Sequence, residues 1–276
     1  MSDSVLSVRA LLARHAAADR ADAEVLLCAA LPCERAFLIA HGEHVPSAEQ
    51  RARFDDWMTR RAAGWPVAYL TGRRAFWTLA LQVTPEVLIP RPETEWVVEY
   101  ALQKLDAGAR RVLDLGTGSG AIALAIAKER PRAHIVAVDA SPAALALAQQ
   151  NARANGIANV EFVVGAWFAP VPDERFDVIV SNPPYVRDDD PHLREGDVRF
   201  EPRMALVAGP DGLEALRTII AAAPAHLAPS GWLIVEHGYD QGAAVRALMQ
   251  SAGMIDIASV RDLAGHERVS LARSPR

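Results

Sequence analysis

The sequence predicts an α/β fold in which a doubly wound, parallel, seven-stranded sheet follows a small N-terminal helical domain and a β-hairpin connector. Three observations predict it. Helical patterns fill the first 65 residues, a β-rich and proline-rich stretch comes next, and from residue 110 onward short apolar runs alternate with helical patterns. We therefore expect a helical domain over residues 1–72, the connector over 73–92 and the sheet domain over 93–276.

The helical domain contains several recognisable helix signals. One helix is expected over Ala21–Ala30, and a second over Glu34–Ala40 that ends at Gly42, a residue suited to a left-handed C′ position. Ser47 and Gln50 form a capping-box pattern that begins a third helix. The apolar stripe of this third helix, expected in the core, comprises Phe54, Trp57, Met58 and Ala62.

The connector begins with the β-rich run Phe76–Val83 and ends with the rigid, extended segment Ile89–Pro92. Alternation in the run places four side chains on one face: Trp77, Leu79, Leu81 and Val83. The aromatic pair at its start is expected to pack between the two domains. In the proline segment, Arg91 and Glu93 are expected either to line the mouth of a site or to pair with each other.

The sheet domain begins with a helix expected over Glu93–Leu105 and then alternates strands with helices. The expected strands are Arg111–Leu115, His134–Asp139, Val160–Val164, Phe176–Ser181, Gly231–Glu236, Met254–Val260 and Arg268–Ala272. The helices between them are Gly120–Glu129, Ala143–Ala154, Gly212–Ala223 and Gln241–Ala252. In such a sheet, ligands bind at the carboxyl ends of the strands.

Composition excludes several classes of protein. The chain is 51% hydrophobic and 23% charged, which is typical of globular domains. Its only cysteines, Cys28 and Cys33, predict neither a disulfide framework nor a metal site. We find no secretory signal and no apolar run of membrane-spanning length, so a cytoplasmic protein without a membrane partner is expected. The net charge of −5 argues against direct nucleic-acid binding as the main task.

A glycine-rich turn follows the first predicted strand of the sheet domain. The turn Gly116-Thr117-Gly118-Ser119-Gly120 leads directly into a helix, and Asp139 ends the next strand, 23 residues after Gly116. Glycines let the backbone approach a ligand closely, and an acid at that position can accept hydrogen bonds from both hydroxyls of a ribose. A nucleoside-containing cofactor is therefore expected. Because Gly116, Gly118 and Ala121 also match G-x-G-x-x-A, this motif alone leaves a nicotinamide dinucleotide open.

A second motif, Asn182-Pro183-Pro184-Tyr185, follows the strand Phe176–Ser181. Two prolines fix the backbone and hold the residue before each of them extended, so the loop is stiff. Such a loop suits recognition of a planar –NH₂ group: the Asn182 side-chain oxygen and the Pro183 carbonyl can each accept one N–H. The Tyr185 ring can lie against the plane of the bound group.

A planar –NH₂ group is a poor nucleophile because its lone pair is delocalised. Two fixed acceptors that hold both hydrogens favour a pyramidal nitrogen aimed at an electrophile, and such alignment can be worth roughly 7–11 kcal/mol. A sulfonium methyl group would supply that electrophile without a metal. No general base is needed before attack, since the methylated nitrogen loses its proton readily.

Taken together, these residues resemble class I S-adenosyl-L-methionine-dependent methyltransferases, whose Rossmann-like sheet matches the fold predicted above. The resemblance is carried by Asp114–Gly120, Asp139 and Asn182–Tyr185. Further motifs resemble one subfamily, the peptide chain release factor N(5)-glutamine methyltransferases (HemK/PrmC): Leu88–Glu95, Ala166–Phe168, Gly196–Pro202 and Val235–Gly238. By resemblance, the substrate is the glutamine of the Gly-Gly-Gln motif of class I release factors, and S-adenosyl-L-homocysteine is the product of the cofactor.

The resemblance also implies roles for individual residues. The turn 116–120 would wrap the methionine end of the cofactor, Asp139 would hold the ribose hydroxyls and Trp167 would pack near the adenine. Asn182 would contact both cofactor and substrate, and residues 182–185 would hold the glutamine amide, with Asn182, Pro183 and Tyr185 as the catalytic set. One departure is Ala166, which stands where many class I enzymes carry an acid that accepts a hydrogen bond from the adenine amine.

Rival functions are separated by particular features. A ribosomal-protein glutamine methyltransferase would differ mainly in its head domain. An adenine-N6 DNA methyltransferase uses the same kind of loop, but it needs a basic recognition region, which neither half of this chain supplies. A non-catalytic scaffold for translation factors would not need complete cofactor and amide motifs, and in a nicotinamide oxidoreductase the amide-holding loop would have no function.

A charged stretch and one histidine have both structural and functional explanations. The charged stretch 187–209 is expected to be a solvated loop or a docking loop for the partner protein, and His237 is expected to be structural.

Overall fold

The computed structural model describes residues 6–15, 19–105 and 110–275, and its chain forms two compact units. The first unit comprises Met1–Gly72 together with Glu195–Phe200, and the second comprises Arg73–Arg194 together with Glu201–Arg276. Each unit has its own hydrophobic core.

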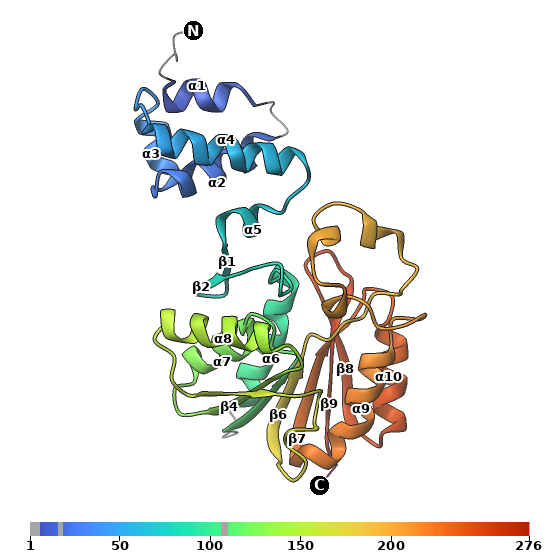
Figure 1. Ribbon diagram of the computed structural model, residues 1–276. Helices are drawn as coiled ribbons and strands as arrows, with labels where there is room; N and C mark the ends of the chain where they lie inside the picture. Colours follow the sequence, from blue (N-terminus) through green and yellow to red (C-terminus); the bar gives the residue numbers. More distant parts are fainter. Residues whose placement is uncertain (1–5, 16–18, 106–109, 276) are drawn as a thin grey trace. The chain divides into compact units, whose positions relative to one another are not determined.

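The first unit is helical, as the sequence predicts. Its helices are α1 (Val8–Ala13), α2 (Arg20–Ala30), α3 (Arg35–Ala40), α4 (Ala48–Ala62) and α5 (Val67–Thr71) (Figure 1). The capping box that begins α4 is confirmed: Gln50 N donates to Ser47 Oγ at 3.2 Å, and Ser47 N donates to the Gln50 side chain at 2.9 Å. Phe54 and Met58 of α4 are buried in the core, and Trp57 packs against it.

Two details of the helical prediction are wrong. Gly42 does not adopt a positive φ; its carbonyl instead accepts a hydrogen bond from Arg9 N at 2.8 Å, so a contact with α1 fixes the chain after α3. Ala62 is exposed rather than part of the core. It is the last residue of α4, and the residues of the stripe that are buried, Phe54 and Met58, lie in the preceding turns of the helix.

The segment Glu195–Phe200 packs within the first unit although it lies far along the chain. Arg61 of α4 donates to Asp197 at 3.0 Å, and the ring of Phe200 lies 5.0 Å from that of Trp65, centroid to centroid. A charge pair and an aromatic contact therefore bind this segment to the helical core.

The second unit is a seven-stranded sheet in the order β5-β4-β3-β6-β7-β9-β8. Its strands are β3 (Arg111–Leu115), β4 (His134–Asp139), β5 (Val160–Val164), β6 (Phe176–Ser181), β7 (Leu227–Glu236), β8 (Ile255–Arg261) and β9 (Glu267–Arg273). All neighbours pair in parallel except β9, which runs antiparallel to both β7 and β8. The seven-stranded α/β fold predicted from sequence is confirmed, but the sheet is not wholly parallel as expected, because β9 is antiparallel to its neighbours, and β7 begins earlier than expected.

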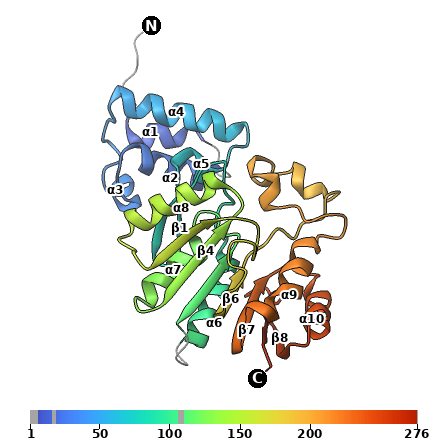
Figure 2. The ribbon, with the colours of Figure 1, turned by 60° about the horizontal axis from the view of Figure 1, so that its bottom comes forward.

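Helices cover both faces of the sheet (Figures 1 and 2). They are α6 (Glu95–Leu105), α7 (Ala121–Glu129), α8 (Pro142–Ala154), α9 (Glu214–His226) and α10 (Gly242–Ser251). Successive strand residues alternate between two clusters: Val112 packs in the one that contains residues of α6 and α7, and Leu113 in the one that contains residues of α9 and α10. Burial on both faces explains why these strands read as nearly continuous apolar runs.

The start of α9 differs from the expectation that it begins at Gly212. This glycine has φ +70°, and a Cβ there would clash with the carbonyl of Tyr185. Gly212 therefore belongs to a tight loop packed on the backbone after β6, and the helix begins two residues later, at Glu214.

The connector forms the hairpin of β1 (Arg73–Phe76) and β2 (Leu79–Gln82). Trp77 lies in its turn with φ +54°, not on the strand face that the alternation suggested. Phe76 is buried in the core of the second unit, and the indole N–H of Trp77 donates to Glu129 of α7 at 2.9 Å. Both side chains thus have partners within the second unit.

Asn151 of α8 joins the hairpin to the glycine-rich turn. Its side chain is fully buried; Oδ1 accepts from Gln82 N at 2.7 Å, and Nδ2 donates to the carbonyls of Gln82 at 3.0 Å and Ser119 at 2.9 Å. One carboxamide thus satisfies three backbone groups, two at the end of β2 and one in the glycine-rich turn.

Replacing Asn151 with alanine should therefore lower the free energy of unfolding by about 2–4 kcal/mol, since buried backbone groups lose their partner. Urea denaturation would measure the loss. Asn155→Ala is the matched control, because the Asn155 side chain is only half-buried and donates to Ala80 at 3.3 Å and to the Asn151 carbonyl at 2.9 Å. Equal losses in the two variants would contradict the role given to Asn151.

Candidate active site

A cavity lies at the carboxyl ends of β3, β4, β5 and β6, entirely within the second unit. Its volume is about 230 Å³, far more than the roughly 10–15 Å³ that a single water needs, so it can hold an organic ligand. Eight of the predicted site residues line it: Gly116, Thr117, Gly118, Ser119, Asp139, Trp167, Asn182 and Pro184. The structure therefore brings the two sequence motifs to one cavity.

The glycine-rich turn forms one wall. Gly116 and Gly118 have φ of +74° and +55°, a conformation that glycine adopts without strain. A Cβ on Gly118 would meet nothing within 4 Å, so the backbone here faces open space. Gly120, which does not line the cavity, has a different requirement: a Cβ there would lie 3.0 Å from Leu124 and 3.2 Å from Ala148. The first glycines leave room for a ligand, and the last one allows helix packing.

Asp139 lies at the end of β4 and faces the same turn. Its Oδ2 accepts from Gly118 N at 2.8 Å, and its Oδ1 accepts from Ser141 N at 2.8 Å. Each carboxylate oxygen can accept a further hydrogen bond, so the pair can receive two adjacent hydroxyl groups of a ligand. The two backbone donors hold the carboxylate in place for that task.

Trp167 follows β5 with φ +50°, in the left-handed region that a bulky residue rarely occupies. Its ring lies near the glycine turn: a Cβ on Gly116 would be 3.7 Å from Trp167 Cζ3. Strain of this kind concentrates at functional sites. The flat ring on the cavity wall can pack against the face of a planar group.

Asp114 lies beneath the turn, fully buried at the end of β3. Its Oδ2 accepts from the Thr117 hydroxyl at 2.7 Å and from Ala123 N at 3.2 Å. Its Oδ1 has no hydrogen-bond partner among the described residues. Burial raises the pKa of this carboxyl to about 7, with a smaller contribution from the negative charge of Asp139. Asp114 therefore ties the turn to the start of α7.

The Asn-Pro-Pro-Tyr loop begins where β6 ends. The Asn182 Nδ2 atom donates to Thr94 Oγ1 at 3.1 Å. Pro183 is buried and does not line the cavity. Tyr185 also stays out of the wall: its hydroxyl donates to Glu236 Oε1 at 3.2 Å, and its carbonyl accepts from Gln241 Nε2 at 3.0 Å. The loop is therefore anchored at both ends, with Asn182 at the cavity.

Of the remaining sequence candidates, Arg91 and His237 have structural partners. Neither Arg91 nor Glu93 lines the cavity, and Arg91 does not pair with Glu93; it donates to the buried carboxylate of Glu201 at 2.6 Å. The pairing prediction failed because Glu201 is 110 residues away in the chain. The ring of His237 is bound to Ser270 at 2.8 Å and is buried, in agreement with the structural role expected for it.

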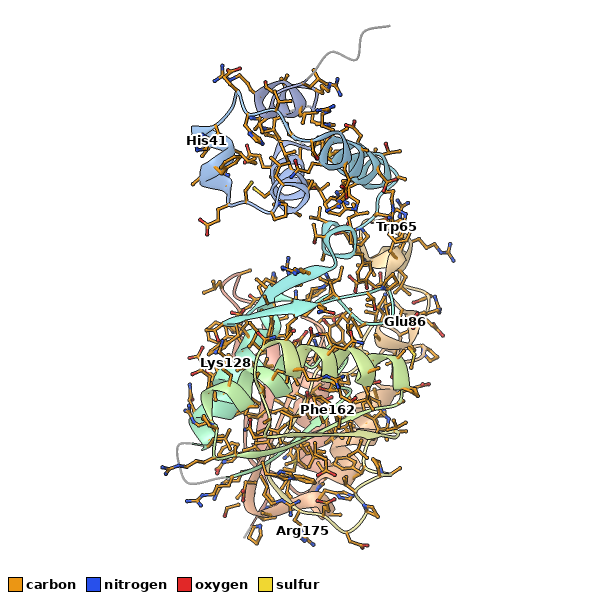
Figure 3. The ribbon with its side chains drawn as sticks, turned by 60° about the vertical axis from the view of Figure 1, so that its left-hand side comes forward. His41, Trp65, Glu86, Lys128, Phe162 and Arg175 are labelled. Atoms are coloured by element: carbon orange, nitrogen blue, oxygen red, sulfur yellow. The ribbon has the colours of Figure 1, made fainter. Side chains whose placement is uncertain are left out.

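Sequence reasoning missed four kinds of contribution to the site. Thr94 contacts Asn182, and Glu236 contacts Tyr185. The loop after β2 adds Glu86, which lines the cavity and is labelled in Figure 3, together with Val87 and Leu88. Met204 and Ala205, which lie much later in the chain, also line the cavity. The Leu88–Glu95 and Val235–Gly238 motifs contain Leu88, Thr94 and Glu236, and the charged stretch 187–209 contains Met204 and Ala205, but none of these signals singled out the individual residues.

Among the described residues, no cluster of histidine, cysteine, aspartate and glutamate could hold a metal ion. Within the same residues, no helix combines the length and apolar character needed to cross a membrane.

Comparison with known proteins identifies the class and the family. Residues 98–195 match the model of the methyltransferase small domain, and residues 6–72 match that of the PrmC N-terminal domain. Of solved structures, the human Mettl16 catalytic domain in complex with a MAT2A 3′UTR hairpin shares the fold, with a TM-score of 0.58 and 16% identity over 82% of this chain and 81% of that one. The chain is thus an enzyme of the class I methyltransferase fold.

Curated relatives specify it further. The release factor glutamine methyltransferase of Xylella fastidiosa is 55% identical over 93% of this chain and 94% of its own length. The protein of the same name from Pseudomonas aeruginosa is 52% identical over 92% of both chains. This chain belongs to the release factor glutamine methyltransferase family. The nicotinamide oxidoreductase that the glycine pattern alone left open is therefore excluded.

Burial of Asp114 should make the stability of the protein depend on pH. An unfolded aspartate has a pKa of about 3.9, so between that pH and about 7 the Asp114 carboxyl is protonated in the folded protein but ionised in the unfolded chain. Unfolding then releases a proton, and stability falls as the pH rises. Asparagine does not titrate. When the pH is raised from 5 to 8, the free energy of unfolding of Asp114→Asn should therefore fall by roughly 2 kcal/mol less than that of the wild type.

Urea denaturation at the two pH values would measure this difference. Glu236, whose pKa is also raised to about 7 by burial, titrates in both proteins and so cancels from the comparison. Identical pH dependence in the two proteins would contradict the assignment to Asp114.

Proposed function

We propose that this enzyme transfers a methyl group from S-adenosyl-L-methionine to the side-chain amide nitrogen of the glutamine in the Gly-Gly-Gln motif of class I peptide chain release factors. One observation carries the proposal: Asn182 lines the same cavity as the glycine turn and Asp139, so an amide acceptor adjoins a nucleoside cradle. Membership of the release factor glutamine methyltransferase family supports the choice of substrate.

The residues of the cavity fit this cofactor. The open backbone face at Gly118 leaves room for its methionine end, Asp139 can accept hydrogen bonds from both ribose hydroxyls, and Trp167 can pack on the adenine. When bound, the cofactor supplies a sulfonium methyl group as the electrophile and leaves as S-adenosyl-L-homocysteine. Ala166 cannot accept a hydrogen bond from the adenine amine through its side chain.

The chain's own residues act on the glutamine amide. Asn182 donates through Nδ2 to Thr94, so its Oδ1 can accept one amide N–H. Pro183 itself is buried outside the cavity wall, but it lies between the two loop residues that line the cavity, and we propose that its backbone carbonyl accepts the other N–H. Fixing both hydrogens orients the nitrogen lone pair toward the cofactor cradle, which lowers the entropic part of the barrier. Tyr185 supports the loop through Glu236 and Gln241.

The direct test is to incubate the enzyme with a methyl-labelled donor and a purified class I release factor, and to map the label by mass spectrometry. We expect one methyl group on the glutamine of the Gly-Gly-Gln motif. A release factor whose motif glutamine is replaced by alanine is the control and should stay unlabelled. Absence of label from the wild-type factor, or label on another residue, would overturn the proposed function.

Two variants should separate transfer from cofactor binding. Asn182→Ala removes an acceptor that matters at the reacting nitrogen, so we expect the rate of transfer to fall by about 10²–10³-fold while the Kd for S-adenosyl-L-homocysteine stays within about threefold. Asp139→Ala removes two charge-assisted hydrogen bonds, so that Kd should rise by at least about tenfold. Calorimetry measures binding and single-turnover labelling measures transfer. Full activity of the first variant, or unchanged affinity of the second, would refute the corresponding role.

A further inference from the structure

The contacts behind Asn182 connect it to residues that no sequence motif assigned to the reaction. Asn182 Nδ2 lies 3.1 Å from Thr94 Oγ1. Thr94 ends the short 3-10 segment Pro92–Thr94, lines the cavity and is only 3% exposed. Water therefore has little access to its hydroxyl, and the contact with Asn182 is protected from competition.

The other end of the loop is held by a different side chain. Glu236, the last residue of β7, is 2% exposed, and β7 is the strand next to β6, which leads into Asn182. Tyr185 donates to Glu236 Oε1 at 3.2 Å. Glu236 therefore holds the loop at Tyr185, whereas Thr94 is the side chain that contacts Asn182.

The contact with Thr94 leaves one side of the Asn182 carboxamide for the cavity. The –NH₂ side donates to Thr94 Oγ1, whose lone pairs can accept it. Asn182 Oδ1 is then the atom left for the cavity. If the carboxamide were flipped, the cavity would receive –NH₂, which cannot accept a substrate N–H.

We propose that Thr94 is a positioning residue that holds the Asn182 carboxamide by its –NH₂ group and so leaves the oxygen for the substrate amide. The inference rests on the proposed function, in which Asn182 Oδ1 accepts an N–H of the glutamine side chain. Thr94 acts through Asn182 and does not contact the reacting atoms. Because it acts on orientation alone, its loss should lower kcat and leave cofactor affinity nearly unchanged.

A matched pair of variants at Thr94 tests this. Thr94→Val keeps the shape of the side chain but removes the hydroxyl, so nothing favours the productive orientation, and kcat for release factor methylation should fall at least about tenfold. Thr94→Ser restores the hydroxyl and should recover at least a third of the wild-type kcat. For both variants, the Kd for S-adenosyl-L-homocysteine and the urea midpoint should change little, which separates orientation from folding.

The outcomes distinguish this inference from the proposed function. If the wild-type enzyme does not methylate the release factor glutamine, the proposed function fails. If it does, but Thr94→Val keeps more than half of the wild-type kcat, the positioning role fails alone. The role also fails if Thr94→Ser is as impaired as Thr94→Val, or if the loss in Thr94→Val comes with an equal loss of cofactor affinity or stability.

Discussion

Coverage of the sheet by helices on both faces is the constraint on which the site depends. Strand side chains alternate between two apolar clusters, so neither face of the sheet is free to receive a polar ligand. The carboxyl edge remains, and there each strand must turn while its backbone groups stay satisfied. The glycine turn, Asp139 and Asn182 all occupy this edge, because it is the place where polar side chains from neighbouring strands can converge.

The turns at this edge are also held in place by hydrogen bonds from polar side chains. Asp114 binds the glycine turn to the start of α7, Asn151 binds the same turn to the connector hairpin, and Gln241 binds the loop after β6. Two of the acids involved near the site, Asp114 and Glu236, have their pKa raised to about 7 by burial. Burying groups that are costly to ionise is typical of proteins that give up stability for a preorganised site.

Most of the fold could be predicted from the sequence because its signals are local. The boundaries of β3 to β6 follow from apolar runs, and the capping box of α4 follows from two residues three positions apart. The glycine turn and Asn182 could also be predicted, because each belongs to a contiguous motif that directly follows a strand of the sheet. The local signals failed at Gly42 and Trp77, where a contact with a distant segment sets the conformation.

The part of the site that escaped prediction depends on pairs far apart in the chain. Thr94 and Asn182 are separated by 88 positions, and Arg91 and Glu201 by 110. The partner of Glu236 could not be found from the strand that carries it, since a buried acid at a strand end has the same local pattern as an exposed one. Only the parallel order of β6 and β7 brings these residues to one place.

The segment Glu195–Phe200 has a consequence for how the protein can be divided. Its Arg199 donates to the carbonyl of Ala63 at 2.7 Å, and its Phe200 packs on Trp65. A truncated protein that began at Arg73 would keep this segment but lose both partners, which would leave an aromatic ring and a guanidinium with nothing to pack on. The helical domain is therefore not a detachable module: its last structural piece is encoded more than a hundred residues downstream, inside the catalytic half of the chain.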